Sequence, residues 1–250
     1  MASASVDGSA ETNASPESLT GAARELSALK ASTANRTTAR RPNRRGQLMR
    51  EKLIGAAAEC FREYGYTKTR ISDIVHRAGT AQGNFYRHFT GLDEIFVATL
   101  EPALAELAAS SDRRLPVNDE RDALIAVNVT FFQAYARHRH LLRVMREAAA
   151  VSGNDGFNRL WLRTRADFVD RTERWLKHLH DQGRIGLTNF RLLAEALGCM
   201  TEQMAYVHIG LPAATPRPER IRQLGKIVGE VWYRSLPAGP DAGRSAPAGD

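Results

Sequence analysis

Apolar residues recur at helical spacing along most of this chain. One apolar stripe follows the period of an amphipathic helix and ends at Gly65, and a second, shorter stripe ends at Gly79. Their members are Met49, Leu53, Ala56, Ala57, Cys60, Phe61 and Tyr64 in the first, and Ile71, Ile74, Val75 and Ala78 in the second. Because glycine after the last periodic residue is typical of a helix C-terminus, the pattern predicts two consecutive helices.

The helical pattern continues toward residue 236. The remaining expected ranges are 81–88, 92–113, 119–137, 139–150, 155–182, 188–209 and 217–236. The sequence lacks alternating runs of β-branched residues closed by tight turns, which would predict strands. We therefore expect an all-α protein of about nine helices.

Both ends of the chain differ in composition from this helical part. Residues 1–43 are rich in Ala, Ser and Thr, and residues 237–250 consist largely of turn-forming and small residues. Such segments bury too little apolar surface to offset the entropy lost on ordering. We expect both to be disordered tails.

Charge and cysteine usage narrow the class of protein. Lys and Arg number 35 against 28 Asp and Glu, and the resulting net charge of +7 fits a nucleic-acid partner. Cys60 and Cys199 lie far apart among apolar residues, which predicts two buried free thiols rather than a disulfide framework or a zinc site. The sequence shows neither a secretory signal nor an apolar run of membrane length, so we expect a cytoplasmic protein with no membrane partner.

Residues 65–89 have the sequence pattern of a helix-turn-helix. A helix is followed by a turn at Gly79 and then by a short second helix, in which Phe85 and Phe89 fall four apart and can anchor it to the core. The other faces of this second helix carry polar or amphipathic side chains, namely Gln82, Asn84, Tyr86, Arg87 and His88. In this motif the second helix enters the major groove of DNA while the first braces it against the backbone.

The chain resembles the TetR/AcrR family of bacterial regulators in this region. The matching residues are Ala57, Ala58, Phe61, Gly65, Tyr66, Thr69, Asp73, Ile74, Ala78, Gly79, Gly83, Tyr86, His88 and Phe89. The resemblance implies a three-helix DNA-binding domain over 44–91 and a helical ligand-binding and dimerisation domain over 92–236.

Two positions depart from the family pattern. Ala81 stands where the family has a Ser or Thr cap, and the loss of that oxygen should cost about 1 kcal/mol unless Thr80 takes over as the cap. Leu92 stands where the family favours a lysine that reaches a phosphate. The basic residues that precede the first helix, among them Arg44 and Arg45, could supply the missing cation by binding phosphates or the minor groove; alternatively they form a solvated tail.

The resemblance also implies which residues contact DNA. Gln82, Gly83 and Tyr86 would approach bases or the flanking backbone, and His88 would approach a phosphate. Arg87 could read a guanine or pair with a phosphate, and both alternatives stay open. The full candidate set is Arg44, Arg45, Arg70, Ser72, Thr80, Gln82, Gly83, Asn84, Tyr86, Arg87 and His88.

Three segments of the second half, 129–149, 157–183 and 194–206, show a weak similarity to the EthR-type ligand-binding domain. This similarity implies an apolar cavity for a small-molecule effector. The candidate lining residues are Phe132, Trp161, Phe168, Thr201, Gln203 and Met204. Pro102, inside the helix expected over 92–113, is a candidate kink between the two domains.

The sequence therefore predicts a DNA-binding transcription regulator. We expect a homodimeric repressor that binds a palindromic double-stranded operator and is released by a small apolar or amphipathic ligand. An activator or a co-repressor-dependent regulator of the same family is an alternative, and so is a helical adaptor protein with a degenerate DNA-binding head. We expect no enzyme, cofactor or metal site, because the sequence offers no catalytic constellation and its paired histidines lie two apart.

Overall fold

The computed structural model describes residues 44–111, 120–150 and 155–239. The expected N-terminal tail, 1–43, and most of the expected C-terminal tail lie outside the described residues. The start of the C-terminal tail was predicted wrongly, because residues 237–239 lie against the loop after residue 183. There the Gly186 N–H donates to the Pro237 carbonyl at 3.0 Å, and Ile185 forms an isolated β-bridge with Ala238.

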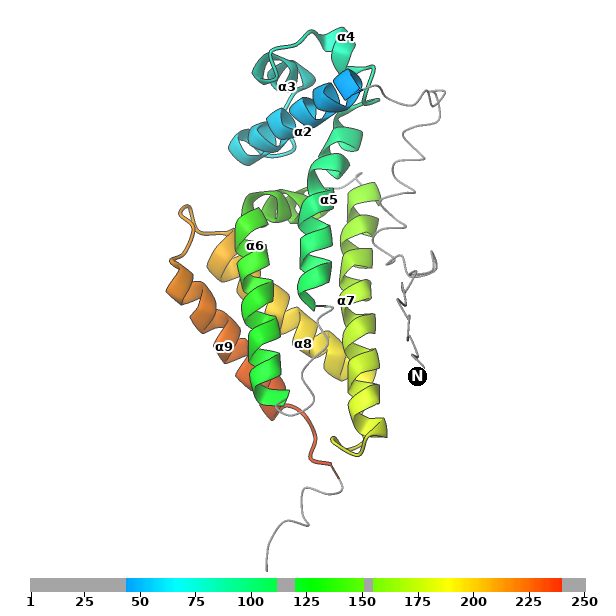
Figure 1. Cartoon of the computed structure of the whole chain (residues 1–250), viewed down its shortest axis with the longest axis vertical. Helices are drawn as coiled ribbons and strands as arrows, with labels where there is room; N and C mark the ends of the chain where they lie inside the picture. Colours follow the sequence, from blue (N-terminus) through cyan, green and yellow to red (C-terminus); the bar gives the residue numbers. More distant parts are fainter. Residues whose placement is uncertain (1–43, 112–119, 151–154, 240–250) are drawn as a thin grey trace, which may run out of the picture.

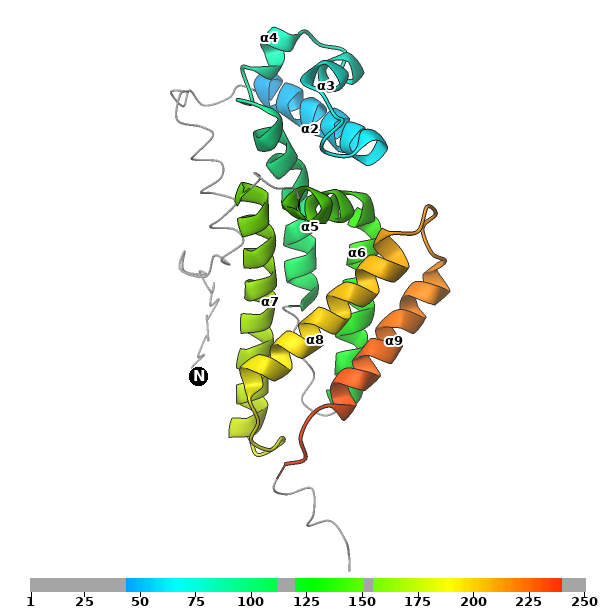
Figure 2. The same ribbon diagram turned by 180° about the vertical axis from the view of Figure 1, so that it is seen from behind.

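The prediction of an all-α protein is confirmed: the described residues form eight α-helices and one π-helical turn, with no strand among them. The elements are α2 (Arg44–Tyr64), α3 (Ile71–Arg77), α4 (Gln82–Phe85), α5 (Leu92–Ser111), α6 (Glu120–Ala150), α7 (Asp155–Asp181), α8 (Phe190–Ala205), the π-helical turn η2 (Tyr206–Gly210) and α9 (Pro218–Arg234). Helices α2, α3 and α4 form one end of the molecule, and α5 runs from them into a bundle of α6 to α9 (Figures 1 and 2).

Helix α6 was predicted as two helices that meet near residue 138, but it is continuous from Glu120 to Ala150. The residue that explains this difference is Arg139, whose side chain is buried. Its Nη1 donates to the carbonyls of Ile209 and Ala214 at 2.9 and 3.0 Å, and its Nη2 donates to the carbonyl of Ala213 at 2.8 Å. Arg139 therefore holds the π-helical end of α8, and the loop that leads to α9, against the middle of α6.

Burial of the Arg139 guanidinium disfavours its charged form. Desolvation, followed by repulsion from Arg143, lowers the pKa of Arg139. Three backbone carbonyls accept from its two terminal nitrogens and compensate for part of the lost hydration. Polar residues at this point of the sequence therefore mark a buried contact rather than a helix break.

Helices α6 and α9 approach each other at two glycines of α9. A Cβ atom placed on Gly225 would lie 2.5 Å from the Cα of Val129, and one on Gly229 would lie 2.6 Å from the Cα of Ile125. Both neighbours are backbone atoms, which cannot rotate away as a side chain can. The G-x-x-x-G spacing thus lets the two helix backbones pack more closely than side chains would allow.

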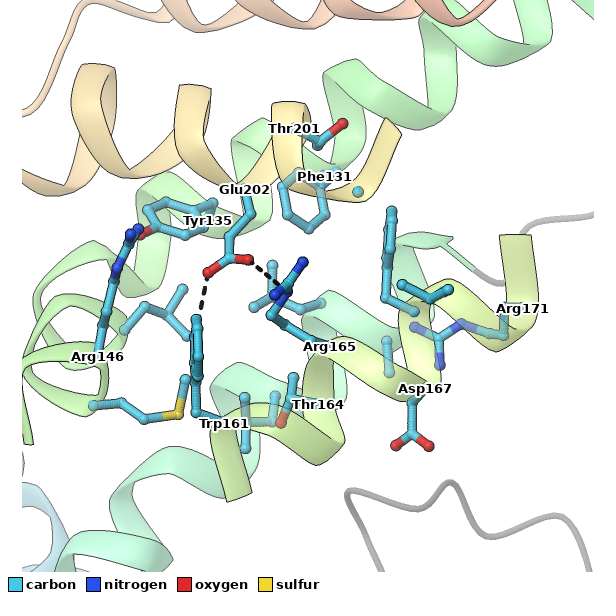
Figure 3. A pocket seen from close by; sticks show the side chains of 18 of the residues that line it. Phe131, Tyr135, Arg146, Trp161, Thr164, Arg165, Asp167, Arg171, Thr201 and Glu202 are labelled. Carbon is cyan, nitrogen blue, oxygen red and sulfur yellow. Dashed lines mark hydrogen bonds and ion pairs between the residues drawn. The ribbon is translucent and has the colours of Figure 1, made fainter. Parts of the chain in front are cut away.

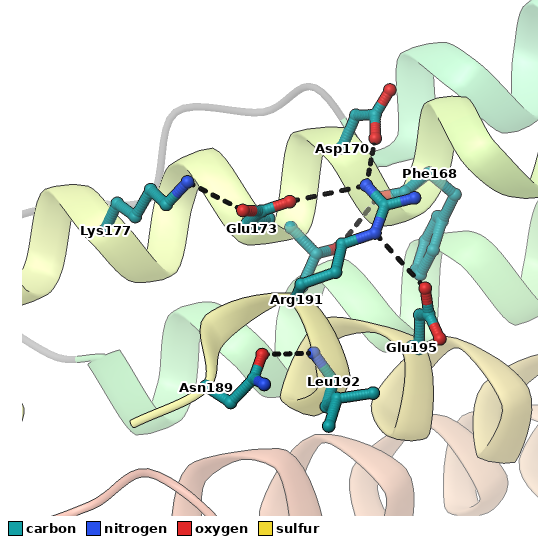
Figure 4. A network of polar contacts seen from close by, with 9 residues as sticks. Phe168, Asp170, Glu173, Lys177, Asn189, Arg191, Leu192 and Glu195 are labelled. Carbon is teal, nitrogen blue, oxygen red and sulfur yellow. Dashed lines mark hydrogen bonds and ion pairs between the residues drawn. The ribbon is translucent and has the colours of Figure 1, made fainter. Parts of the chain in front are cut away.

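Helices α7 and α8 are joined at the surface by one arginine (Figure 4). Arg191, in the first turn of α8, pairs with Asp170 and with Glu173 at 3.3 Å on α7, and with Glu195 at 3.2 Å on its own helix. These three carboxylates raise the pKa of Arg191. Single exposed ion pairs contribute little stability, but a shared network holds α7 and α8 at one crossing geometry.

The two cysteines differ in their environment. Cys60 is a buried free thiol, as predicted, whereas Cys199 is exposed. The prediction for Cys199 was wrong: its side chain is exposed, and its Sγ accepts from the Arg165 Nη2 at 2.8 Å. The preceding residue, Gly198, is the buried one, since a Cβ placed on it would lie 3.3 Å from the Phe168 ring of α7.

We expect Gly225→Ala to lower the free energy of unfolding by about 1–3 kcal/mol, because the added methyl group meets the α6 backbone. Gly55→Ala in α2 is the matched control, since no atom lies within 4 Å of the added carbon. Alanine is the better helix former, so the control should gain up to about 1 kcal/mol. Urea denaturation of both variants measures the difference; equal stabilities would contradict the close α6–α9 contact.

Candidate nucleic-acid interface and ligand cavity

The turn between α3 and α4 has the geometry of a helix-turn-helix. Gly79 adopts a φ of +57°, in the left-handed region that favours glycine. Its N–H donates to the carbonyl of His76 at 3.0 Å, and the N–H of Thr80 donates to the carbonyl of Val75 at 3.0 Å. These two hydrogen bonds form a Schellman motif that ends α3 and turns the chain toward α4.

Two polar residues of the motif serve the fold rather than DNA. The Thr69 hydroxyl donates to the Gly65 carbonyl at 2.6 Å, and the carboxylate of Asp73 accepts the Arg70 N–H at 2.9 Å. The second bond satisfies one of the free N–H groups at the start of α3. Thr69 and Asp73 thereby fix the direction in which α3 leaves the loop.

Helix α4 is shorter than the predicted 81–88. It spans Gln82–Phe85, and the following residues form a turn. Ala81 makes no side-chain cap, and Thr80 does not replace it, because its hydroxyl accepts from the Asn84 side chain at 2.8 Å. Helix α4 therefore lacks a side-chain N-cap, and the alternative that Thr80 supplies one does not hold.

Two buried phenylalanines hold the four-residue helix α4 on the core. Phe85 and Phe89 are fully buried and pack together with 5.7 Å between their ring centroids, as the sequence predicted. The guanidinium of Arg50 lies 5.1 Å from the centroid of the Phe89 ring, so the first turns of α2 also brace this element.

The candidate DNA-contacting residues lie on α2, α3, α4 and the turn after α4. The exposed residues among them are Arg44, Arg45, Arg70, Ser72, Gln82, Gly83, Tyr86 and Arg87; Thr80, Asn84 and His88 are half-buried. Arg44 and Arg45 were predicted to precede the first helix, but they form the start of α2. That start lies beside α4 in both views (Figures 1 and 2). Asn84 is engaged within the protein, by Thr80 and by Arg87 at 3.5 Å.

His88 sits among positive charges. Burial, followed by repulsion from Arg50 and Arg87, lowers its pKa. The imidazole is therefore held neutral near pH 7 in the free protein. A phosphate placed beside it would reverse that balance, because an anion favours the imidazolium form.

The first turn of α5 is acidic where the family pattern has a lysine. Leu92 is followed by Asp93 and Glu94, and the Glu94 carboxylate accepts the N–H and the hydroxyl of Thr90 at 2.7 and 2.8 Å. The Tyr66 hydroxyl donates to Asp93. The Tyr66–Asp93 bond attaches the loop after α2 to the start of α5, whereas the Glu94 bonds fix the loop directly before α5.

An aromatic cluster continues this attachment into the second half of the molecule. The centroid distances are 4.7 Å for Phe61–Phe96, 5.1 Å for Tyr66–Phe96, 5.1 Å for Tyr66–Phe157 and 5.1 Å for Phe96–Phe157. The four rings come from α2, the loop after it, α5 and α7. A displacement of α5 or α7 would therefore be transmitted to the helix-turn-helix through direct packing.

A cavity of about 380 Å³ lies among α5, α6, α7 and α8 (Figure 3). Trp161, Phe168 and Thr201, three of the six predicted lining residues, do line it. The predictions for Phe132, Gln203 and Met204 were wrong: Phe132 is fully buried in the core, Gln203 is exposed and Met204 packs against the core. Their neighbours Phe131 and Glu202 line the cavity instead, because one residue along a helix turns the side chain by about 100°.

One part of the cavity wall is polar. The Glu202 carboxylate accepts from the Trp161 indole at 3.2 Å and from the Arg165 Nε at 3.1 Å (Figure 3). Burial, then the nearby Glu202 charge, raises the pKa of Tyr135, so its hydroxyl stays protonated and can donate. The sequence could not identify Tyr135, Arg146, Arg165 or Glu202 as lining residues, since polar side chains on a helix usually face solvent.

The described part of the chain meets neither the requirements of a metal site nor those of a membrane-spanning helix. It holds no group of three or more His, Cys, Asp or Glu side chains that could bind a metal ion. None of its helices is both long and apolar enough to cross a membrane.

Sequence comparisons match the helix-turn-helix region. Residues 53–99 match the family of bacterial regulatory proteins called the tetR family. A helix-turn-helix transcriptional repressor of Mycobacterium tuberculosis is 25% identical over 54% of this chain and 68% of its own length. The transcriptional activator FasR of Mycolicibacterium smegmatis is 32% identical over 41% of this chain and 51% of its own. The chain thus spans about half to two thirds of the length of these curated relatives.

A structural comparison extends the likeness to the second half. SmeT in complex with triclosan superposes with a TM-score of 0.60 at 23% identity, over 81% of this chain and 96% of SmeT. SmeT is the repressor of a multidrug efflux pump of Stenotrophomonas maltophilia. The structural likeness concerns the fold, whereas the family match and the curated relatives concern the sequence. Together with the helix-turn-helix geometry, they show that residues 53–99 are a DNA-binding region of the tetR type, and that the chain as a whole is similar in fold to TetR-family regulators.

Proposed function

We propose that this protein is a homodimeric transcription repressor that binds palindromic double-stranded DNA and is released by a small apolar or amphipathic ligand. The observation that carries the proposal is the exposed row of Gln82, Gly83, Tyr86 and Arg87 on an element anchored by two buried phenylalanines. A polar, partly cationic surface at one end of the molecule suits the edges of bases and the phosphates of DNA. The cavity supports the ligand part of the proposal, and its volume lies within the range of small-molecule sites.

Gly83 offers a test of DNA contact that leaves the fold intact. No atom lies within 4 Å of a Cβ placed on Gly83, so Gly83→Ala should not destabilise the protein. A methyl group at that position would keep the α4 backbone from approaching DNA closely. We expect affinity for the duplex directly upstream of the protein's own gene to fall roughly tenfold or more, measured by fluorescence anisotropy.

Gly55→Ala is the matched control for this experiment. It makes the same chemical change on α2, again with no atom within 4 Å, and should leave DNA affinity unchanged. The wild-type affinity should also fall steeply as salt rises, because phosphate contacts release counterions. Equal affinities of the Gly83 and Gly55 variants, or a salt slope near zero, would overturn the DNA-binding proposal and favour the adaptor alternative.

Helices α8 and α9 support the homodimer. They lie side by side across one face of the molecule (Figure 2). Leu192, Val207 and Leu211 on or after α8, and Ile227 and Val231 on α9, are large apolar residues with exposed side chains. An exposed apolar face of this kind is typical of a protein–protein interface, and a twofold dimer would present two recognition helices to half-sites about 34 Å apart.

Placing a charge on this face should dissociate the dimer. We expect Val231→Arg to give a monomer by sedimentation equilibrium, because a guanidinium would have to be buried against its twofold mate. Leu162→Arg on α7 is the control, since Leu162 is exposed to 49% and Val231 to 43%. A dimer that survives the Val231 change would show that α9 is not the interface.

Release by ligand would act through α5. Its residues between Glu101 and Ala108 line the cavity, while Phe96, nearer its start, packs on Phe61 of α2. Pro102 lies at the start of the lining part and cannot donate to the carbonyl of Ala98, which makes this turn the easiest place for α5 to bend. A hundredfold loss of DNA affinity requires only about 2.7 kcal/mol of coupling between the two sites.

An activator is the second candidate. FasR, which resembles this chain at 32% identity, is named as an activator. Binding of DNA by the ligand-free protein favours a repressor released by ligand, whereas binding only in the presence of ligand favours an activator or a co-repressor mechanism.

A further inference from the structure

Arg146 is a cavity residue with unused hydrogen-bonding capacity. It lies on α6 with its guanidinium carbon 3.9 Å from the centroid of the Tyr206 ring. Its Nη2 donates to the Gln203 side chain at 3.2 Å, whereas its Nη1 is buried and has no hydrogen-bond partner. A buried, charged N–H group without an acceptor is costly, so this atom is suited to receive an acceptor from a ligand.

The charge around Arg146 is not balanced by the protein. Glu202 is the nearby acid, but its two oxygens already accept from Trp161 and Arg165. Within the described residues Arg146 forms no ion pair with a carboxylate. Two guanidiniums thus face one carboxylate, and one positive charge is left for a ligand.

A second donor lies beside it. Figure 3 shows Tyr135 next to the Arg146 guanidinium, on the same helix and at the same part of the cavity. The Tyr135 hydroxyl stays protonated, as argued above, and can donate to an anion. A cation at this point would instead meet Arg146 directly and be repelled.

The rest of the wall suits an apolar body. Leu104 and Leu107 of α5, Phe131 of α6 and Phe168 and Val169 of α7 contribute apolar surface to the cavity. The other charged lining residues, Glu101, Asp167 and Arg171, each have a contact of their own, and Figure 3 shows Asp167 and Arg171 away from Arg146. The cavity is therefore apolar over most of its wall, with one unpaired cation.

We infer that the effector of this protein is an apolar molecule that carries one carboxylate, and that Arg146, helped by Tyr135, binds that carboxylate. The inference rests on the proposed function only in treating the cavity as the effector site. It makes Arg146 the residue that selects the charge of the ligand, while α5 and α7 select its size and shape.

Three ten-carbon probes that differ only in their head group test this inference. Isothermal titration calorimetry on the full-length protein should show that decanoate binds roughly tenfold or more tightly than decan-1-ol, with decylamine weakest. Arg146→Met keeps most of the side-chain length but removes the charge, so decanoate should then bind about as weakly as decan-1-ol. Arg146→Lys should keep the preference for decanoate, because it keeps the charge.

Arg163→Met is the matched control, because Arg163 is exposed on α7 and does not line the cavity. It should leave all three affinities unchanged. Equal affinities of the wild-type protein for the three probes, no binding of any of them, or a decanoate preference that survives Arg146→Met would each overturn the inference. Anisotropy with DNA and no probe separates the two proposals: a protein that binds DNA but does not prefer decanoate refutes the ligand class alone.

Discussion

The packing of Phe61 on Phe96 fixes the relation between the two halves of this molecule. Phe96 lies on the same helix whose later residues line the cavity, so α5 belongs to the helix-turn-helix and to the ligand site at once. Tyr66 and Phe157 extend the contact to the loop after α2 and to α7. Because protein cores are close-packed, a change in the cavity that displaces the start of α5 would also displace α2, through the contact of Phe96 with Phe61.

The same constraint explains why so short a recognition element can work. Four residues of α4 could not form a stable helix alone. Phe85 and Phe89 hold them on the core from beneath, and the Schellman turn at Gly79 sets their direction. Gln82, Gly83, Tyr86 and Arg87 are therefore presented on a rigid support, and the orientation of that support is what α5 can change.

The sequence predicted the fold well wherever a local signal exists. Apolar stripes closed by Gly65 and Gly79 mark helix ends, and both glycines have positive φ. Contacts between distant segments left no such signal. From the sequence alone, Arg139 would be placed on the surface, but in the structure it donates to carbonyls of the loop before α9. Gly225 would be expected only to weaken its helix, but in the structure it allows the close contact with α6. Two of the three wrongly predicted lining residues, Phe132 and Gln203, lie one position from a residue that does line the cavity, since spacing alone does not fix the rotation of a helix.

The central claim is that α5 couples the cavity to the DNA-contacting surface. Coupling of two binding sites is reciprocal, so DNA must change ligand affinity by the same factor as ligand changes DNA affinity. The most direct measurement is the affinity of the cavity for decanoate, or for another ligand found to bind it, without DNA and with saturating operator DNA. A fall in ligand affinity equal to the fall in DNA affinity caused by the ligand is predicted. An affinity that DNA leaves unchanged would contradict the coupling.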